Sequence, residues 1–475
     1  MKLFFIILFL ITGLSSLAQT PKDGNRRCVS KAEMDSLFCR IYRKAPTANG
    51  MEPNDTLTLN GTTAYTHAFM WPLSASTNYY QPSFYYISNY LDLASTYSIV
   101  RDYHCGDRSY DSRDDDGNIY NHTGIDIATG PFGWKMMDDN NVNVIAAEGG
   151  RIVDKHIGEA SRTCRPDGVA NTYYGNYIAI KHDDSTSAFY MHMKGGTVTS
   201  KNIGARVNMG EYLGVVGSSG NSSDPHLHFE VRSPSGGIMD PFQNGNCRNN
   251  YAGLITSSLW AQEEPYHNKK ILSVFTLSGN WTGSTCDTGG ISSGSSEVVP
   301  YKNHFSEGNL IYFSAAVRDI NDGNTVRLRI FKPNGTEISD YTYTMPSSDT
   351  FRAMKLIPLQ VLIAPGDLGT YRLLCTYNSA SEVHLFTIGC PGALTLSGAR
   401  SSNTGAISGS TITSTETLSS LTINVEYQAE TEVIFTPGFI ANAGSEFLGR
   451  INNCTIGGQR NLSLDTKPMK PDLKN

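Results

Sequence analysis

The residues best suited to chemistry lie in three polar segments in the first half of the chain. In NHTGIDIATG, His122 and Asp126 are four residues apart. In DPHLHFEV, His226 and His228 are two residues apart, and a third segment, FYMHMK, carries His192. Imidazole nitrogen and carboxylate oxygen are ligands of Zn²⁺ in proteins. Together the three segments could build a metal site.

The first segment has the pattern of a strand with one polar face. Side chains two or four residues apart on a strand point to the same side of the sheet. This alternation predicts His122, Gly124 and Asp126 on one face. Thr123 and Ile125 are expected on the opposite face, so that one face can bind while the other packs.

The other two segments also read as strands. In HLHFEV both histidines share a face with Glu230, which either orients a ligand or serves as an ordinary strand carboxylate. In FYMHMK, His192 is expected on the face of Tyr190, with Met191 and Met193 opposite them. The three segments are therefore expected to present polar faces to a shared site.

Two histidines and one aspartate suit a catalytic zinc ion, because three protein ligands leave the fourth position for water. Zinc lowers the pKa of that water to about 7 and polarises the carbonyl of the bond to be cut. Four imidazoles and a carboxylate exceed what the ion needs, so the surplus histidines are available for proton transfer and oxyanion stabilisation. The chemistry predicted is amide hydrolysis without a protein nucleophile.

These motifs, in this order, resemble lysostaphin-type (LytM-like) peptidoglycan endopeptidases. The resemblance rests on His-x-x-x-Asp, on the aromatic residue shortly before the lone histidine in YMH, and on GSSGNSSDPHLHFEV, with GNYIAI and a closing Asp-Pro in agreement. It implies that His122, Asp126 and His228 hold zinc and that His192 and His226 are the catalytic pair. It also implies a duplicated hybrid motif-like β domain and the peptide stems of peptidoglycan as substrate.

Length and composition predict a mainly β, multi-domain protein. A chain of 475 residues exceeds what one core usually supports, and its 17% charged residues and many glycines favour short strands and turns. An early helix is expected at Ser30–Arg43. The expected organisation is a signal peptide (1–18), an N-terminal extension (19–85), a compact antiparallel β peptidase domain (86–250), an immunoglobulin- or fibronectin-like β-sandwich (266–389), a stacked-strand module (390–456) and a tail (457–475).

The N-terminus predicts export. Lys2 precedes the apolar run Leu3–Ile11, and small residues follow up to Ala18, which is typical of a signal peptide. The apolar run is shorter than the ~20 residues that span a bilayer. A periplasmic or secreted protein of the cell envelope is expected, with no membrane span after cleavage.

The cysteines fit an oxidising compartment. Nine cysteines are scattered without the CxxC spacing of thiolate metal sites, which in an exported chain favours disulfides. The pairs Cys105 with Cys164 and Cys390 with Cys454 would each close one predicted domain.

Other functions remain as alternatives. The net charge of -6 and the lack of a long basic run give no reason to expect a nucleic-acid partner. One alternative is a catalytically inactive LytM-like protein that binds the wall and activates an amidase. Another is an adhesin-like protein that binds through its C-terminal β domains. Inactive domains typically lack a metal ligand, whereas the full set is present here.

Overall fold

Strands dominate the chain, so the mainly β fold predicted from the sequence is confirmed. The predicted signal peptide (1–18), the helix expected at Ser30–Arg43 and the predicted tail (457–475) lie outside the described residues. The computed structural model describes residues 68–77, 79, 81–94, 96, 99–113, 119–163, 174–242, 258–281, 297–347, 351–364, 368–389, 394–400, 407–418, 424–442 and 445–451.

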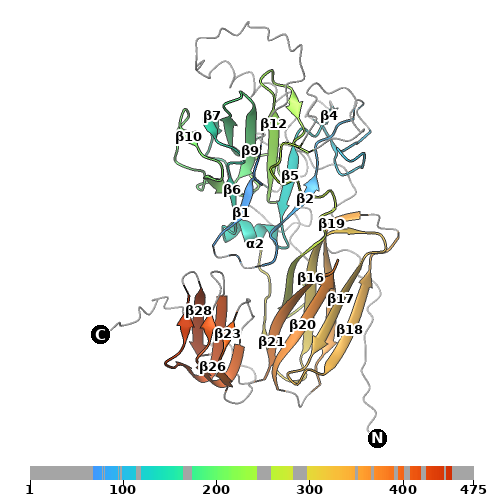
Figure 1. Cartoon of the computed structure of the whole chain (residues 1–475). Coiled ribbons are helices and arrows are strands. Elements are labelled where there is room, and N and C mark those ends of the chain that lie inside the picture. Colours follow the sequence, from blue (N-terminus) through green and yellow to red (C-terminus); the bar gives the residue numbers. More distant parts are fainter. Residues whose placement is uncertain are drawn as a thin grey trace, which may run out of the picture.

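The first part of the described chain forms two β-sheets that share a core (Figure 1). The larger sheet is antiparallel, in the order β10 (Arg206–Val207), β7 (Gly150–His156), β8 (Asn176–Lys181), β9 (Ser187–Met193), β12 (His226–Arg232), β5 (Ile125–Thr129) and β2 (Tyr85–Asn89), with β13 (Ile238–Met239) beside β12. The smaller has the order β1 (Leu73–Ala75), β6 (Val142–Ile145) and β11 (Tyr212–Val215). A hairpin of β3 (Asp111–Arg113) and β4 (Ile119–Asn121) and the helix α2 (Gly133–Asp138) complete this part.

Alternation of apolar and polar residues explains how the larger sheet positions the predicted site. Ile127 of β5 and Phe229 of β12 are fully buried in a core that also contains Val144 of the smaller sheet. The polar residues that alternate with these apolar ones, Asp126 on β5 and His228 on β12, face the other way. In the antiparallel register of β5 and β12, His228 stands opposite Asp126.

The described residues before residue 86 contribute to this core. Leu73 of β1 pairs with Val144 of β6. Phe69 forms an isolated bridge with Trp260, and both side chains are buried in the same core. The fold therefore recruits residues on both sides of the range 86–250.

A two-sheet sandwich follows (Figure 1). One sheet has the order β14 (Lys270–Leu277), β16 (Leu310–Asn321) and β19 (Phe351–Leu362). The other has the order β15 (His304–Phe305), β21 (Ala380–Ile388), β20 (Gly369–Tyr377), β17 (Thr325–Phe331) and β18 (Glu337–Thr344). The inner faces of both sheets share one apolar core, which includes Phe313, Leu328 and Phe386.

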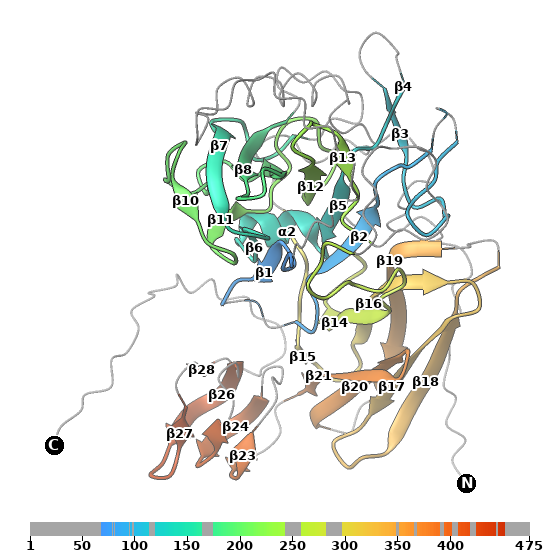
Figure 2. The ribbon, with the colours of Figure 1, turned by 45° about the horizontal axis from the view of Figure 1, so that its top comes forward.

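The last described part consists of stacked parallel strands, which lie apart from the first two-sheet unit in Figure 2. One sheet has the order β22 (Leu394–Leu396), β24 (Ile407–Ser414), β26 (Asn424–Phe435) and β28 (Glu446–Ile451). The other has the order β23 (Ala399–Arg400), β25 (Thr417–Leu418) and β27 (Ile440–Ala441). Parallel stacking of this kind agrees with the stacked-strand module expected from the sequence.

An apolar cluster joins the sandwich to the larger sheet. Tyr86 of β2 and Phe132, which precedes α2, lie in one buried cluster with Leu272, Phe275 and Ala316 of the sandwich. The sandwich is therefore packed directly against the strand that borders β5.

Candidate metal centre and catalytic histidines

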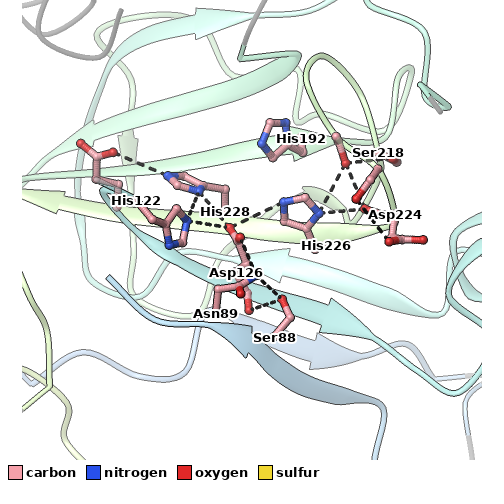
Figure 3. Close-up of polar contacts among 12 residues, drawn as sticks. Ser88, Asn89, His122, Asp126, His192, Ser218, Asp224, His226 and His228 are labelled. Atoms are coloured by element: carbon pink, nitrogen blue, oxygen red, sulfur yellow. Dashed lines mark hydrogen bonds and ion pairs between the residues drawn. The ribbon is translucent and has the colours of Figure 1, made fainter. Parts of the chain in front are cut away.

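Three of the predicted residues bring their ligand atoms to one point (Figure 3). Nε2 of His122 lies 3.2 Å from Oδ1 of Asp126 and 3.3 Å from Nδ1 of His228. The third separation, from Nδ1 of His228 to Oδ1 of Asp126, is 2.9 Å. All three side chains are buried. Within the described part of the chain, this is the one group of three or more His, Cys, Asp or Glu residues close enough to hold a metal ion.

The geometry fits zinc. Tetrahedral zinc with bonds of about 2.0–2.2 Å separates two ligand atoms by roughly 3.3–3.6 Å. The three observed separations lie within about half an ångström of that spacing. Two imidazole nitrogens and one carboxylate oxygen are also donor types that zinc accepts, and three protein ligands leave a position for water.

Neighbouring side chains orient the carboxylate of Asp126. Asn89 donates from Nδ2 to Oδ2 at 3.2 Å, and the hydroxyl of Tyr110 donates to the same oxygen at 3.3 Å. Oδ1 is thereby turned toward the histidines. Burial alone would raise the pKa of Asp126, but the neighbouring His122 and His226 and the close contacts with the imidazoles of His122 and His228 lower it well below its usual range. A lowered pKa favours the carboxylate form, which is the form that binds metal ions.

A backbone carbonyl orients His122. Nδ1 of His122 donates to the carbonyl oxygen of Tyr90 at 2.7 Å, directly after β2. The ring also stacks on Tyr110, with ring centres 4.5 Å apart. Because a carbonyl oxygen can only accept, Nδ1 carries the proton and Nε2 presents its lone pair to the cluster.

A buried charged group lies on the other side of the His228 ring. Oε2 of Glu230 is 3.6 Å from Nε2 of His228. Thr123 donates to Oε2 at 2.7 Å, and Nε of Arg232 donates to Oε1. Burial would raise the pKa of Glu230, but Arg232 and His228 outweigh it and lower the pKa to about 2. Glu230 is thus a carboxylate next to the ring nitrogen of His228 that does not face Asp126.

The first motif differs from the continuous strand expected for it. Strand β5 begins at Ile125, so the residues before it do not follow strand alternation. Thr123, expected on the apolar face, instead donates to Glu230. A Cβ atom on Gly124 would lie 2.6 Å from Nε2 of His228. Only a glycine therefore lets the His228 ring lie against this stretch of chain.

The two predicted catalytic histidines, His192 and His226, are held by the same kind of hydrogen bond. Nδ1 of His192 donates to the carbonyl of Ser219 at 2.8 Å, and Nδ1 of His226 donates to the carbonyl of Asp224 at 2.8 Å. Nε2 is then the nitrogen that can exchange a proton in each ring. Nε2 of His226 lies 3.6 Å from Oδ1 of Asp126. The ring centres of His192 and His226 are 4.8 Å apart. Figure 3 shows both rings beside the three candidate ligands.

A β-bulge redirects His192. This residue has a φ of +61°, and the register between β8 and β9 shifts there, from Ile178 opposite Tyr190 to Asn176 opposite Met193. One extra residue on β9 is the signature of a bulge, which changes the direction of side chains. Met193 consequently joins Tyr190 in the core. Alternation predicted Tyr190 and Met193 on opposite faces of the sheet. That prediction is wrong because the bulge adds one residue between them.

The sequence alone did not predict the residues that orient the candidate ligands and Glu230. Asn89, Tyr110 and Thr123 are polar residues without a fixed spacing to the metal motifs. Only the tertiary structure brings Asn89 and Tyr110 to Asp126. The alternation in SFYYISNY could have predicted β2, but not which strand it would border.

The family comparison agrees with the resemblance drawn from the motifs. Peptidase family M23 matches residues 120–241, which include all five predicted site residues. The resemblance to lysostaphin-type endopeptidases is therefore confirmed for this part of the chain. Within the described residues no helix is both long and apolar enough to cross a membrane.

Curated relatives match this chain over short spans. Cell division protein DipM of Caulobacter vibrioides is 31% identical over 103 residues, 21% of this chain and 16% of that protein. Peptidoglycan DD-endopeptidase ShyB of Vibrio cholerae is 30% identical over 115 residues, 24% of this chain and 21% of that protein. The alignments thus span about a fifth or less of the relatives' length.

Among solved structures, the catalytic domain of the antimicrobial peptidase lysostaphin from Staphylococcus simulans is 26% identical. The alignment covers 26% of this chain and 76% of that chain, with a TM-score of 0.18.

Proposed function

We propose that this chain is an exported, zinc-dependent endopeptidase that hydrolyses peptide cross-links of peptidoglycan. His122, Asp126 and His228 hold the zinc ion, and His192 and His226 are the catalytic pair. The observation that carries the proposal is the convergence of three ligand atoms beside two histidines with fixed Nδ1 atoms. The peptidase family match and the similarity to peptidoglycan DD-endopeptidase ShyB support the reaction and the substrate class.

Bound zinc supplies a water with a pKa of about 7 and polarises the scissile carbonyl. The residues of the chain do the remaining work. Asp126 stays ionised because the neighbouring histidines lower its pKa. The free ring nitrogens are Nε2 of His192 and Nε2 of His226, the latter 3.6 Å from Oδ1 of Asp126. One of them would take up the proton of the attacking water and pass it to the leaving amine.

Peptidoglycan digestion tests the proposal. Purified peptidoglycan is incubated with the full chain, with the chain after chelator treatment, and with the chelated chain after zinc is restored. We expect cross-linked fragments to be cut in the first and third samples only, as seen by mass spectrometry of the released peptides. The cut bond is read from the same spectra. Wall binding without any cleavage in all three samples would instead favour the inactive, wall-binding alternative.

A further inference from the structure

We infer that Arg318 of the sandwich, together with Arg108, positions the metal ligands through strand β2. The inference rests on the proposed function, because the ligands concerned are the residues assigned to zinc there. Both arginines are almost fully buried. Each acts on the backbone of β2, so they are positioning residues and not catalytic ones.

Strand β2 ends the larger sheet among the described strands, so one of its edges lacks a neighbouring strand there. The carbonyl groups of Tyr85 and Ile87, two residues apart, point toward the same edge. Nη1 of Arg318 donates to the carbonyl of Tyr85 at 3.0 Å. Nη2 of Arg108 donates to the carbonyl of Ile87 at 2.9 Å. Two guanidinium groups therefore occupy the place of the next strand.

The guanidinium of Arg318 is fixed from several sides. Nε donates to the carbonyl of Asn268 at 2.9 Å, and Nη2 donates to Glu264 at 3.1 Å. Its Cζ atom lies 4.5 Å from the centre of the Tyr85 ring, whose hydroxyl donates to Glu264 at 2.8 Å. The Tyr85 carbonyl is thus held in one position relative to β16, the strand that carries Arg318.

Arg108 makes a second connection to the sandwich. Its Nη2 lies 2.9 Å from Oδ1 of Asp319, the neighbour of Arg318 on β16, and its Nη1 donates to the carbonyl of Tyr266. Oδ2 of Asp319 in turn accepts from the backbone N–H of Asn268 at 3.0 Å. The ion pair therefore ties the Ile87 carbonyl to the same sandwich strand.

The residues that follow on the chain contact two metal ligands. Ser88 donates from Oγ to the carbonyl of Asp126 at 3.2 Å, and Asn89 donates to its carboxylate. The carbonyl of Tyr90 accepts from Nδ1 of His122. A displacement of β2 along its axis would move these three partners together and would misalign both ligands.

The packing of the sandwich against the larger sheet does not depend on the charges of Arg108 and Arg318. The apolar cluster that contains Tyr86, Phe132 and Leu272 already joins the two parts. Buried ion pairs are weak sources of stability, whereas fixed hydrogen bonds from a planar guanidinium specify geometry. The arginines are therefore better explained by the placement of β2 than by the strength of the contact.

The test measures zinc affinity in the full chain by competition with a chelator of known affinity. Arg318→Lys keeps the charge but loses the planar, multiply donating group, and we expect it to weaken zinc binding about 10-fold, as outer partners of metal ligands do. Arg327→Lys is the matched control, because Arg327 pairs with Asp340 on an exposed face of the same sandwich. It should leave zinc affinity unchanged. A thermal unfolding curve of each variant establishes that it is folded.

A double-mutant cycle separates positioning from general destabilisation. Asn89→Ala removes the contact between β2 and Asp126, so after it Arg318→Lys should cost less zinc affinity than it does alone. Unchanged zinc affinity in folded Arg318→Lys would overturn the inference. So would a fold-loss of zinc affinity in the double variant that equals the product of the two single losses. Absence of zinc binding in the unmodified chain would instead overturn the proposed function.

Discussion

His228 and Glu230 face one another across a buried gap, with Nε2 of the ring 3.6 Å from Oε2 of the carboxylate. They are two residues apart on β12 and therefore share a face of the sheet. The other ring nitrogen of His228 faces Asp126. Carboxylates that contact the second nitrogen of a metal-binding histidine fix its orientation and raise its basicity. Glu230 thus has the position of such an outer partner.

Glu230→Gln is expected to weaken zinc binding by about 10- to 100-fold, because the amide removes the negative charge beside His228. It also removes the carboxylate charge that pairs with buried Arg232, so a lower unfolding temperature is expected. Zinc affinity and thermal unfolding measure the two effects. Glu211→Gln, at an exposed ion pair with Lys201, is the control. Native zinc affinity in folded Glu230→Gln would show that Glu230 is an ordinary strand carboxylate.

Gly124→Ala is expected to reduce zinc binding more than it reduces stability. The new Cβ atom would lie 2.6 Å from Nε2 of His228 and 2.8 Å from the carbonyl oxygen of Phe229, closer than real Cβ contacts allow, so the His228 ring or the adjoining backbone must shift. Gly279→Ala is the matched control, because nothing lies within 4 Å of its Cβ position. Metal content after dialysis against a weak chelator compares the two variants. Equal zinc content in both would contradict the explanation given for Gly124.

Sequence patterns predicted the elements whose residues alternate regularly. HLHFEV forms β12 because its apolar residues pack in the core while its polar residues face the site, and the period of two is visible in the sequence. The same rule failed at His192, where a bulge changes the period, and at Thr123, which precedes the strand. Bulges depend on pairing with a neighbouring strand, which a local pattern does not contain.

Contacts between distant segments were not predictable in the same way. Asn89 meets Asp126 because β2 pairs with β5, and Arg318 meets Tyr85 because the sandwich packs against β2. Neither contact leaves a spacing in the sequence. The five candidate site residues could be predicted because their order and local context resemble a known family, whereas the residues that orient them required the fold.

The disulfide prediction concerns the peptidase part. Cys105 is disulfide-bonded, but Cys164 lies outside the described residues, so their pairing stays a prediction. We expect non-reducing peptide mapping of the protein to recover one cross-linked peptide that contains both residues. Buried Cys375 is free and should be alkylated only after unfolding. A cross-link from Cys105 to another cysteine would reject the pairing.

Glu297 is expected to make the chain less stable as the pH rises toward neutrality. Burial raises its pKa from 4.5 to about 7, although the backbone N–H groups of Lys135 and Trp134 donate to it. The folded state therefore binds this proton more tightly than the unfolded state. The free energy of unfolding falls as the pH rises from about 4.5 to about 7. The free energy of unfolding of Glu297→Gln should equal that of the native chain near pH 4.5. At about pH 8 it should be higher than that of the native chain by on the order of 1–3 kcal/mol. Denaturant unfolding at both pH values measures this, and an equal effect at both would contradict it.

Substitution of the four histidines and the aspartate of the site should separate metal ligands from catalysts. Ala at His122, Asp126 or His228 removes a donor from a three-ligand set, so zinc and activity should be lost together. His192→Ala leaves that set complete and should keep stoichiometric zinc. Loss of a positioned acid, base or oxyanion donor typically costs about 10²- to 10⁴-fold in rate, so most turnover should disappear.

His192 is a cleaner choice than His226 for this comparison. His226 shares β12 with the ligand His228, so a shift of that strand would disturb both residues. His192 lies on β9, where its Nδ1 is bound to the Ser219 carbonyl and its ring centre is 6.0 Å from that of His228. Zinc content and cleavage of cross-linked peptidoglycan are measured on the same preparation. If His192→Ala loses its zinc, the residue supports the metal site, and if it cleaves at a near-native rate, the residue is not part of the catalytic pair.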